Sequence, residues 1–303
     1  MPPKMPYINC RVAFIVPFVV RLPSSTRSRF PTNMFSFVRR LLPLACLALY
    51  AAQPSVQAAG QPDEPMRLRV EPAPALSANA SIASQYVSRG FRQTWGRPAA
   101  QAGIDYVHPS GWSVGTWFSN VSDRFVENGS LEWDLYGGYS GAAGPLGYSL
   151  MAHYFKYPGA AVGATGMRFD YAEISAGVSY KALYAKYNYT VTRNFFGIAN
   201  ARGTGYLDGG ANVELDSATT LNLHLGEGRV AGAGNDYWNW RDVKIGVTRK
   251  LGRNWKLAGA YTRAFGATHA YERYTTGGPG KLERIGYANP GKNTIVLSLT
   301  RTF

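Results

Sequence analysis

Apolar and polar residues alternate along most of the chain beyond residue 77. In the segment LEWDLYGGYS, Leu131, Trp133 and Leu135 share one parity, while Glu132 and Asp134 take the other. A period of two residues is typical of a β-strand with one apolar and one polar face. The pattern therefore predicts strands rather than helices.

Twelve segments carry this alternation, and each has about the length that a tilted strand needs to cross a bilayer. They are 78–90, 99–108, 111–120, 130–140, 146–157, 170–180, 182–192, 205–215, 219–227, 239–250, 254–264 and 293–303. No run of 18 apolar residues follows residue 60, so the sequence predicts no membrane-spanning helix there.

The connections between these segments alternate in length. Five are short, such as HPSG and LGRN, and six are longer, namely 91–98, 121–129, 158–169, 193–204, 228–238 and 265–292. A soluble sandwich has no reason to sort its loops in this way, whereas an outer-membrane barrel has short periplasmic turns and longer extracellular loops. The predicted fold is an all-β, closed, antiparallel up-and-down transmembrane β-barrel of about 12 strands.

Aromatic residues support the same fold. Those on the apolar parity, mostly near strand ends, are Tyr86, Trp112, Phe118, Trp133, Tyr139, Tyr148, Tyr154, Tyr180, Trp255 and Tyr261. Barrels in membranes carry aromatic girdles at both interfaces. The chain also ends on Phe303, which shares the apolar parity of the last segment, so we expect Phe303 to serve as the signal that the barrel assembly machinery reads.

The first 76 residues predict targeting rather than fold. A signal peptide is expected over 34–58, because Arg39 and Arg40 precede a short apolar core that ends in a small-x-small cleavage pattern. We interpret residues 1–33 as an over-extended start, the Pro-rich stretch 59–76 as a periplasmic linker, and 77–303 as the barrel. The expected location is the bacterial outer membrane after export.

Composition excludes several classes of function. The net charge is +14, but residues 1–58 hold seven basic residues and no acid, which leaves 25 basic and 18 acidic residues, net +7, without a basic block. Nucleic acid is therefore not an expected partner. Both cysteines, Cys10 and Cys46, lie in the first 58 residues, so disulfides and thiolate chemistry are not expected in the barrel.

Several segments resemble the TorF family of outer-membrane porins of Gram-negative bacteria. The similarity extends over about 77–303, and its most specific part is SANASIASQYVSRGFRQTWGRPAAQAGIDY, followed by DYAEISAGVSY, YNYTVTRNFFG and DVKIGVTRKLG. The resemblance implies a barrel with a channel role and no catalytic residues. The long 265–292 connection departs from the family pattern, and we expect this loop to restrict the pore.

The sequence contains no clear pattern of catalytic or metal-binding residues. The histidines His108, His153, His224 and His269 lack metal-ligand spacing, and neither a cofactor nor a metal is expected. An enzymatic barrel is the main alternative, with Ser149 or Ser175 near His153 as its candidates. A non-conducting structural or adhesin barrel is the other alternative.

Polar-parity charges are the candidate lumen residues. They are Arg89, Asp105, Glu132, Asp134, Glu173, Lys186, Asp208, Glu214, Lys244, Lys250 and Lys256. Their order along the strands predicts acids on one wall and most bases on the opposite wall, which would make a transverse field. Pairing between neighbours, such as Lys186 with Glu173 and Asp208, is the alternative.

The expected function is passive diffusion of small hydrophilic solutes through this polar lumen. The expected partners are outer-membrane lipid, the barrel assembly machinery and the solutes.

Overall fold

The computed structural model describes residues 75–272, 274 and 289–303. The predicted start (1–33), signal peptide (34–58) and most of the linker (59–76) lie outside the described residues, as does most of the 265–292 connection. Among the residues that are described, no helix is long and apolar enough to cross a membrane.

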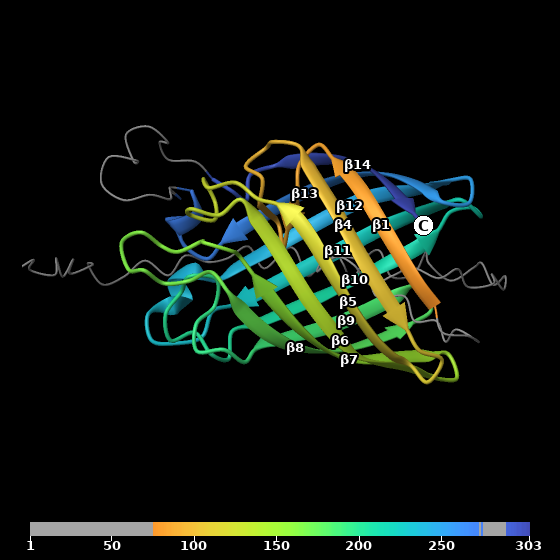
Figure 1. Ribbon diagram of the computed structural model, residues 1–303, viewed down its shortest axis with the longest axis horizontal. Coiled ribbons are helices and arrows are strands. Elements are labelled where there is room, and N and C mark those ends of the chain that lie inside the picture. Colours follow the sequence, from red (N-terminus) through yellow and green to blue (C-terminus); the bar gives the residue numbers. More distant parts are fainter. Residues whose placement is uncertain (1–74, 273, 275–288) are drawn as a thin grey trace, which may run out of the picture. The chain divides into compact units, whose positions relative to one another are not determined.

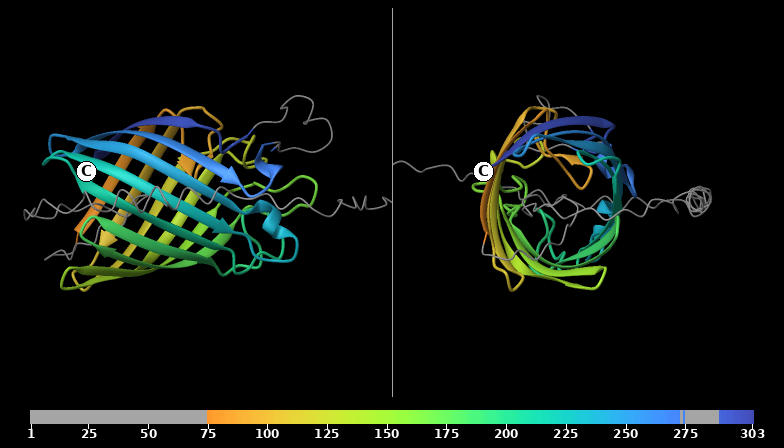
Figure 2. Two further views of the ribbon diagram at one scale, coloured as in Figure 1. Left: turned by 180° about the vertical axis from the view of Figure 1, so that it is seen from behind. Right: turned by 90° about the vertical axis from the view of Figure 1, so that its right-hand side faces the viewer.

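Twelve antiparallel strands of the described chain close into one barrel, with β1 paired to both β4 and β14 (Figures 1 and 2). The strands are β1 (Ala75–Ala83), β4 (Ala99–Val107), β5 (Trp112–Asn120), β6 (Leu131–Ala143), β7 (Leu146–Lys156), β8 (Tyr171–Tyr180), β9 (Leu183–Thr190), β10 (Gly205–Glu214), β11 (Thr219–Arg229), β12 (Trp240–Leu251), β13 (Trp255–Gly266) and β14 (Thr294–Thr302). The predicted fold class is confirmed.

Connections segregate by length, as expected. The five short turns, 108–111, 144–145, 181–182, 215–218 and 252–254, gather at one end, which we call the short-turn end. The longer connections lie at the other end, the long-loop end, and include the 3₁₀ turns η2 (Asn235–Trp238) and η3 (His269–Tyr271).

The barrel is apolar outside and polar inside. On β6, Leu131, Trp133 and Leu135 are exposed, whereas Glu132 and Asp134 are each 2% exposed. Alternate side chains of a strand point to opposite faces, so the parity read from the sequence separates the outer surface from the lumen. This arrangement is the reverse of a soluble barrel.

The first strand was predicted wrongly at its end. The alternation through 78–90 suggested one continuous strand, but β1 stops at Ala83, where its pairing with β4 ends at Ala99 and the chain turns inward. Tyr86 accordingly does not belong to an outer girdle. It is 4% exposed and lies inside the barrel.

The 157–170 connection is anchored by Asp170. Its carboxylate accepts hydrogen bonds from Lys156 Nζ (2.7 Å), Tyr157 N (2.8 Å) and Arg168 Nε (3.1 Å). Burial alone would raise the pKa of Asp170, but these donors lower it below the usual value. The ionised carboxylate therefore stabilises this loop.

Candidate functional site

A hairpin from the first long connection folds into the lumen. Within residues 84–98, β2 (Val87–Ser88) pairs with β3 (Phe91–Arg92), and we call this segment the lumen hairpin. Arg89 and Gly90 form its turn with φ of 48° and 82°. Two positive φ values are what a tight two-residue hairpin turn requires, and the second position favours glycine.

The tip of the lumen hairpin spans the interior from one wall to another. A Cβ added at Gly90 would lie 2.5 Å from Asp242 Cβ and 2.8 Å from Ala264 Cβ, so the turn packs directly against β12 and β13. Arg89, the residue before Gly90, contacts Glu173 on strand β8. The end-on view in Figure 2 shows this hairpin inside the ring of strands.

Arg89 fastens the lumen hairpin to the far wall. Its Nη1 lies 3.0 Å from Glu173 Oε1 and its Nη2 lies 2.5 Å from Glu173 Oε2, which is a bidentate pair. The guanidinium also stacks over the ring of Tyr206, 4.5 Å from its centroid. Arg89 is 7% exposed and Glu173 is 1% exposed, so water screens this ion pair weakly.

Buried carboxylates lie on the lumen side of β4 and β6, and Glu132 contacts the hairpin. Tyr86 of the hairpin donates to Glu132 Oε1 at 3.3 Å, and Tyr136 donates to Asp105 Oδ1 at 2.6 Å. Asp105 is 4% exposed. These acids point inward as expected, but at this level the interior is filled by protein.

A second polar cluster crosses β10, β11 and β12. His224 Nδ1 lies 2.9 Å from Asp208 Oδ1, and its Nε2 lies 2.7 Å from Asp242 Oδ1. Lys186 Nζ approaches Asp208 at 3.5 Å, and the Tyr206 hydroxyl donates to Asp242 Oδ2 at 3.0 Å. The cluster therefore ties the wall behind the hairpin tip to Tyr206, on which Arg89 stacks.

Aromatic side chains cap the hairpin at the long-loop end. Phe91 of the hairpin lies 4.6 Å from Tyr271 and 5.7 Å from Trp240, measured between ring centroids. The Tyr271 hydroxyl donates to Trp238 O at 2.7 Å. Burial raises the pKa of Tyr271, so its phenol stays protonated as a donor.

Tyr274 belongs to the same cap. Its hydroxyl donates to Phe125 O at 2.9 Å, and the two rings lie 5.3 Å apart. Tyr271 and Tyr274 come from the 265–292 connection, so the described part of that loop contributes to the cap. The predicted restriction of the pore by the whole loop stays a prediction.

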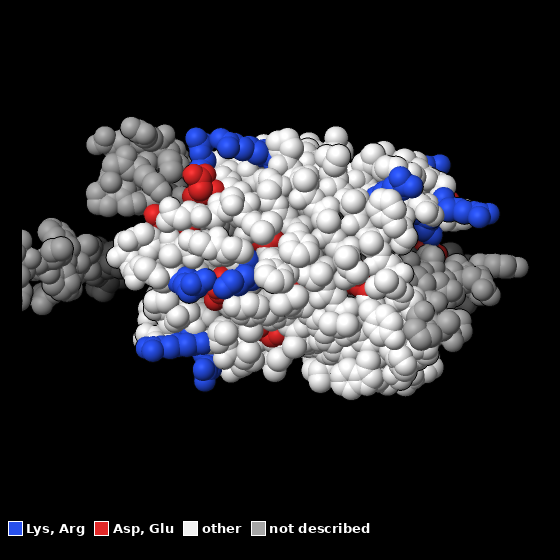
Figure 3. Space-filling view, viewed as in Figure 1, with Lys and Arg blue, Asp and Glu red and all other residues white. Residues whose placement is uncertain are grey.

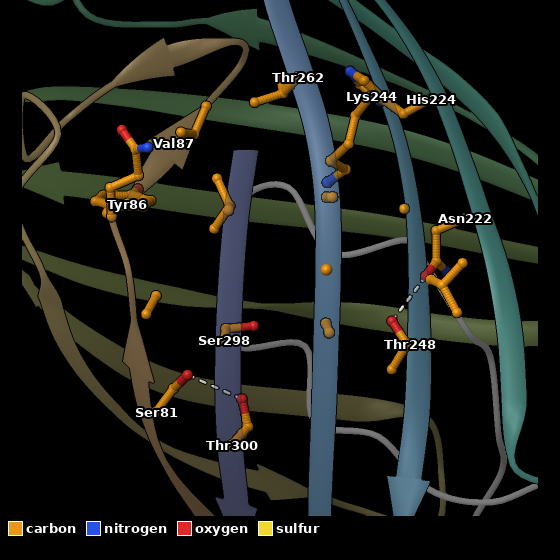
Figure 4. A pocket seen from close by; sticks show the side chains of 18 of the residues that line it. Ser81, Tyr86, Val87, Asn222, His224, Lys244, Thr248, Thr262, Ser298 and Thr300 are labelled. Carbon is orange, nitrogen blue, oxygen red and sulfur yellow. Dashed lines mark hydrogen bonds between the residues drawn. The ribbon is translucent and has the colours of Figure 1, made fainter. Parts of the chain in front are cut away.

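A cavity of about 210 Å³ lies below the hairpin, toward the short-turn end, between β1, β11, β12, β13 and β14. Its polar lining includes Ser81, Asn222, Lys244, Thr248, Ser298 and Thr300 (Figure 4). Thr248 donates to Asn222 Oδ1 at 2.8 Å, and Thr300 donates to Ser81 Oγ at 3.0 Å. Hydroxyl, amide and ammonium groups can exchange hydrogen bonds with a hydrophilic solute here.

Lys250 and Lys256 lie nearer the short turns than the buried acids Glu132, Asp134 and Glu173 do. Lys244 is the register partner of His224, while Lys250 faces Lys256 across β12 and β13 next to a short turn. Glu214 also lies at the short-turn end and is exposed. The exposure of the lumen charges therefore increases from the buried groups near the long loops to the half-exposed Lys250 and Lys256 near the short turns.

The predicted order of charges along the strands holds for Lys244, Lys250 and Lys256 on β12 and β13. Arg89 does not lie on the wall where the sequence placed it, and the alternative of paired neighbours applies to Lys186. Arg89 contacts Glu173 from the hairpin, and Lys186 contacts Asp208 on the neighbouring strand. The physical reason is that a buried carboxylate is stable only beside a cation or donor, so the register brings opposite charges together. The polar parity already puts His224 and Asp242 on the lumen face, but it does not predict that these two side chains pair.

The candidate residues for an enzymatic site, Ser149, His153 and Ser175, lie on the lumen side of β7 and β8. The His153 ring packs beside Tyr136 and Phe155, with centroids 5.7 Å and 6.1 Å away. Ser175 pairs in register with Met151. Among the described residues, no group of three or more His, Cys, Asp or Glu side chains is arranged to hold a metal ion.

Residues 71–303 match the sequence model of a family described as "Bacterial protein of unknown function (Gcw_chp)", and this range includes every barrel strand. No curated protein sequence matches the chain. The TorF resemblance is a separate prediction that the matched description does not name.

Solved structures similar to this chain include three porins. The KdgM porin has a TM-score of 0.48 at 8% identity, with 75% of this chain and 99% of that chain covered. The NanC porin has a TM-score of 0.42 at 9% identity, with 75% and 98% covered. A mutant of the Rhodopseudomonas blastica porin has a TM-score of 0.31 at 17% identity, with 67% and 55% covered.

Proposed function

Because the chain belongs to the bacterial Gcw_chp family, whose function is unknown, we propose a function from its own geometry. The protein acts as an outer-membrane channel that lets small hydrophilic solutes diffuse through a polar lumen, with the lumen hairpin as its constriction. The TorF resemblance implies the same role. The chain uses no cofactor in this proposal.

The observation that carries the proposal is the reversal of polarity between the two faces of the barrel. Ile82, Leu150 and Ile295 are each more than 60% exposed on the outer face. Figure 3 shows one side of this surface, where lysine and arginine atoms lie toward the two ends and the band between them is largely uncharged. An apolar band of this kind is stable in lipid, and a closed barrel leaves no unpaired strand edge there.

Aromatic residues mark the expected edges of the band. Trp112, Tyr148, Tyr180 and Trp255 are outward and exposed near the short-turn end. In an outer membrane the short turns face the periplasm and the long loops face outward. The cavity below the hairpin then faces the periplasm, while the aromatic cap faces the exterior.

Constriction by the lumen hairpin makes the channel selective by size. A barrel of eight strands has a filled interior, and one of sixteen or more leaves an open channel. Twelve strands leave an intermediate lumen, and here residues 84–98 occupy its outer half. Solutes pass when the hairpin is displaced or through gaps beside it.

The test has two stages. Cell fractionation should recover the protein with outer membranes, and the folded protein should migrate faster unheated than boiled on a denaturing gel. Recovery as a soluble periplasmic protein would end the proposal. Purified protein in planar bilayers should then produce discrete conductance steps. A folded, membrane-resident protein without conductance would favour the structural or adhesin alternative, and hydrolase activity on lipid or peptide would favour the enzyme.

A further inference from the structure

Three outward-facing arginines gather at the long-loop end of neighbouring strands. Arg229 ends β11, Arg241 lies at the start of β12, and Arg263 lies near the end of β13. All three are exposed. They share the parity of the apolar outer residues Leu225, Val243 and Tyr261, so they lie directly above the band that faces lipid.

The register sets the spacing of this arginine cluster. Glu227 pairs with Arg241, and Val243 pairs with Arg263, so each arginine is the diagonal neighbour of the next across adjacent strands. Diagonal neighbours in an antiparallel sheet lie about 7–8 Å apart. The cluster therefore presents three guanidinium groups in one row across three strands.

The cluster keeps a net positive charge after its internal pairing. Glu227 accepts from Arg229 Nη2 at 3.0 Å and lies 3.4 Å from Arg241 Nη2, so one carboxylate is shared by two guanidinium groups. Arg263 stacks over the Phe265 ring at 4.4 Å. Stacking occupies the face of that guanidinium and leaves its N–H edge available for an acceptor.

At the same height β7 ends on the outward Lys156, which pairs with Asp170 at 2.7 Å, whereas β4, β5 and β6 carry no outward charge. The outward positions nearest the long loops are Ala100 on β4, Asn120 on β5 and Leu131 on β6, none of which is charged. A general preference for basic residues at an interface would surround the barrel. The arginine cluster holds three guanidinium groups and one carboxylate on three adjacent strands, and this concentration of positive charge points to a particular anionic group.

We propose that Arg229, Arg241 and Arg263 bind the phosphates of a phosphorylated glycolipid in the outer leaflet. Planar guanidinium groups bind phosphate in a bidentate manner, and an anionic headgroup lies at the depth where the apolar band ends. The acyl chains of that lipid would lie along Leu225, Ile245 and Tyr261. This inference rests on the proposed outer-membrane residence and orientation.

The experiment measures binding of bisphosphorylated lipid A to the detergent-purified protein by native mass spectrometry. Wild type should retain the lipid, and the variant R229A/R241A/R263A should bind it at least tenfold more weakly. Arg249→Ala is the matched control, because Arg249 is an outward arginine of the same strand β12 next to a short turn. Its binding should equal that of wild type.

Two further arms identify the ligand chemistry without relying on a variant. Dephosphorylated lipid A should bind wild type at least tenfold more weakly, and added salt should weaken binding of the phosphorylated lipid through screening. Inorganic phosphate alone should not displace the lipid at equal concentration. Equal binding of the triple variant, equal binding of dephosphorylated lipid, insensitivity to salt, or displacement by phosphate would each overturn the inference.

Failure of this inference is distinguishable from failure of the proposed function. The triple variant should retain wild-type conductance, because its arginines face away from the lumen. A conducting outer-membrane protein that ignores lipid phosphates would refute only the lipid site. A protein absent from the outer membrane would refute the proposed function itself.

Discussion

Removing Arg89 should release the lumen hairpin and raise conductance. In Arg89→Ala the bidentate contacts to Glu173, at 3.0 and 2.5 Å, disappear, and the carboxylate is left 1% exposed without its cation. Breaking a buried ion pair from one side costs about 3–5 kcal/mol. When the hairpin is displaced, water reaches Glu173, so the unpaired carboxylate raises the free energy of the closed arrangement and not that of the open one.

The magnitude follows from the same estimate. With about 1.4 kcal/mol for each factor of ten, the closed-to-open ratio should fall by roughly 10²- to 10⁴-fold. Thr190 Oγ1 still donates to Glu173 Oε1 at 3.4 Å, which places the expected effect toward the lower value. In R89A/E173Q no buried charge is left alone, so its shift should be smaller than that of R89A.

Single-channel recording in planar bilayers measures this effect as open probability and conductance. Arg97→Ala is the matched control, since Arg97 lies in the same connection, carries the same charge and is exposed. Heat-modifiable migration on gels verifies that each variant is folded. If folded R89A conducts like wild type and R97A, the hairpin is not held as a gate by this ion pair.

Three further predictions concern other parts of the barrel. Changing Lys244, Lys250 and Lys256 together to Glu should shift the reversal potential in a salt gradient toward cations, because these side chains face the lumen, and an unchanged potential would mean that ions pass elsewhere. Because the pKa of Asp170 is lowered in the folded protein, its ionised carboxylate stabilises the loop. This contribution is complete above the unfolded-state pKa of about 3.9 and is lost as pH falls through the lower folded-state pKa. Proteolysis of the 157–170 loop should therefore increase on acidification below about pH 4, and Asp170→Asn should remove that pH dependence; a variant with the wild-type profile would contradict it. Deleting Phe303, whose N–H donates to Ala78 O at 2.8 Å, should lower the amount of assembled barrel on quantitative immunoblots of outer membranes, and unchanged assembly would show that no terminal signal is read.

Strand parity and loop order could be predicted from the sequence, because both follow from local chemistry. In β6, Leu131 and Glu132 reach opposite faces whatever the rest of the chain does, since neighbouring side chains of an extended backbone point in opposite directions. Eleven predicted strands accordingly agree with the structure within about three residues at either end.

Only the tertiary structure decided what fills the lumen. Tyr86 and Arg89 continue the alternation of β1, so local pattern could not distinguish a longer strand from a hairpin. Pairing of β1 with β4 ends at Ala83, opposite Ala99, and the chain beyond turns inward, where Glu173 receives Arg89. Pairing of Arg89 with Glu173, 84 residues apart, depends on barrel closure and register, which are non-local properties that no window of sequence contains.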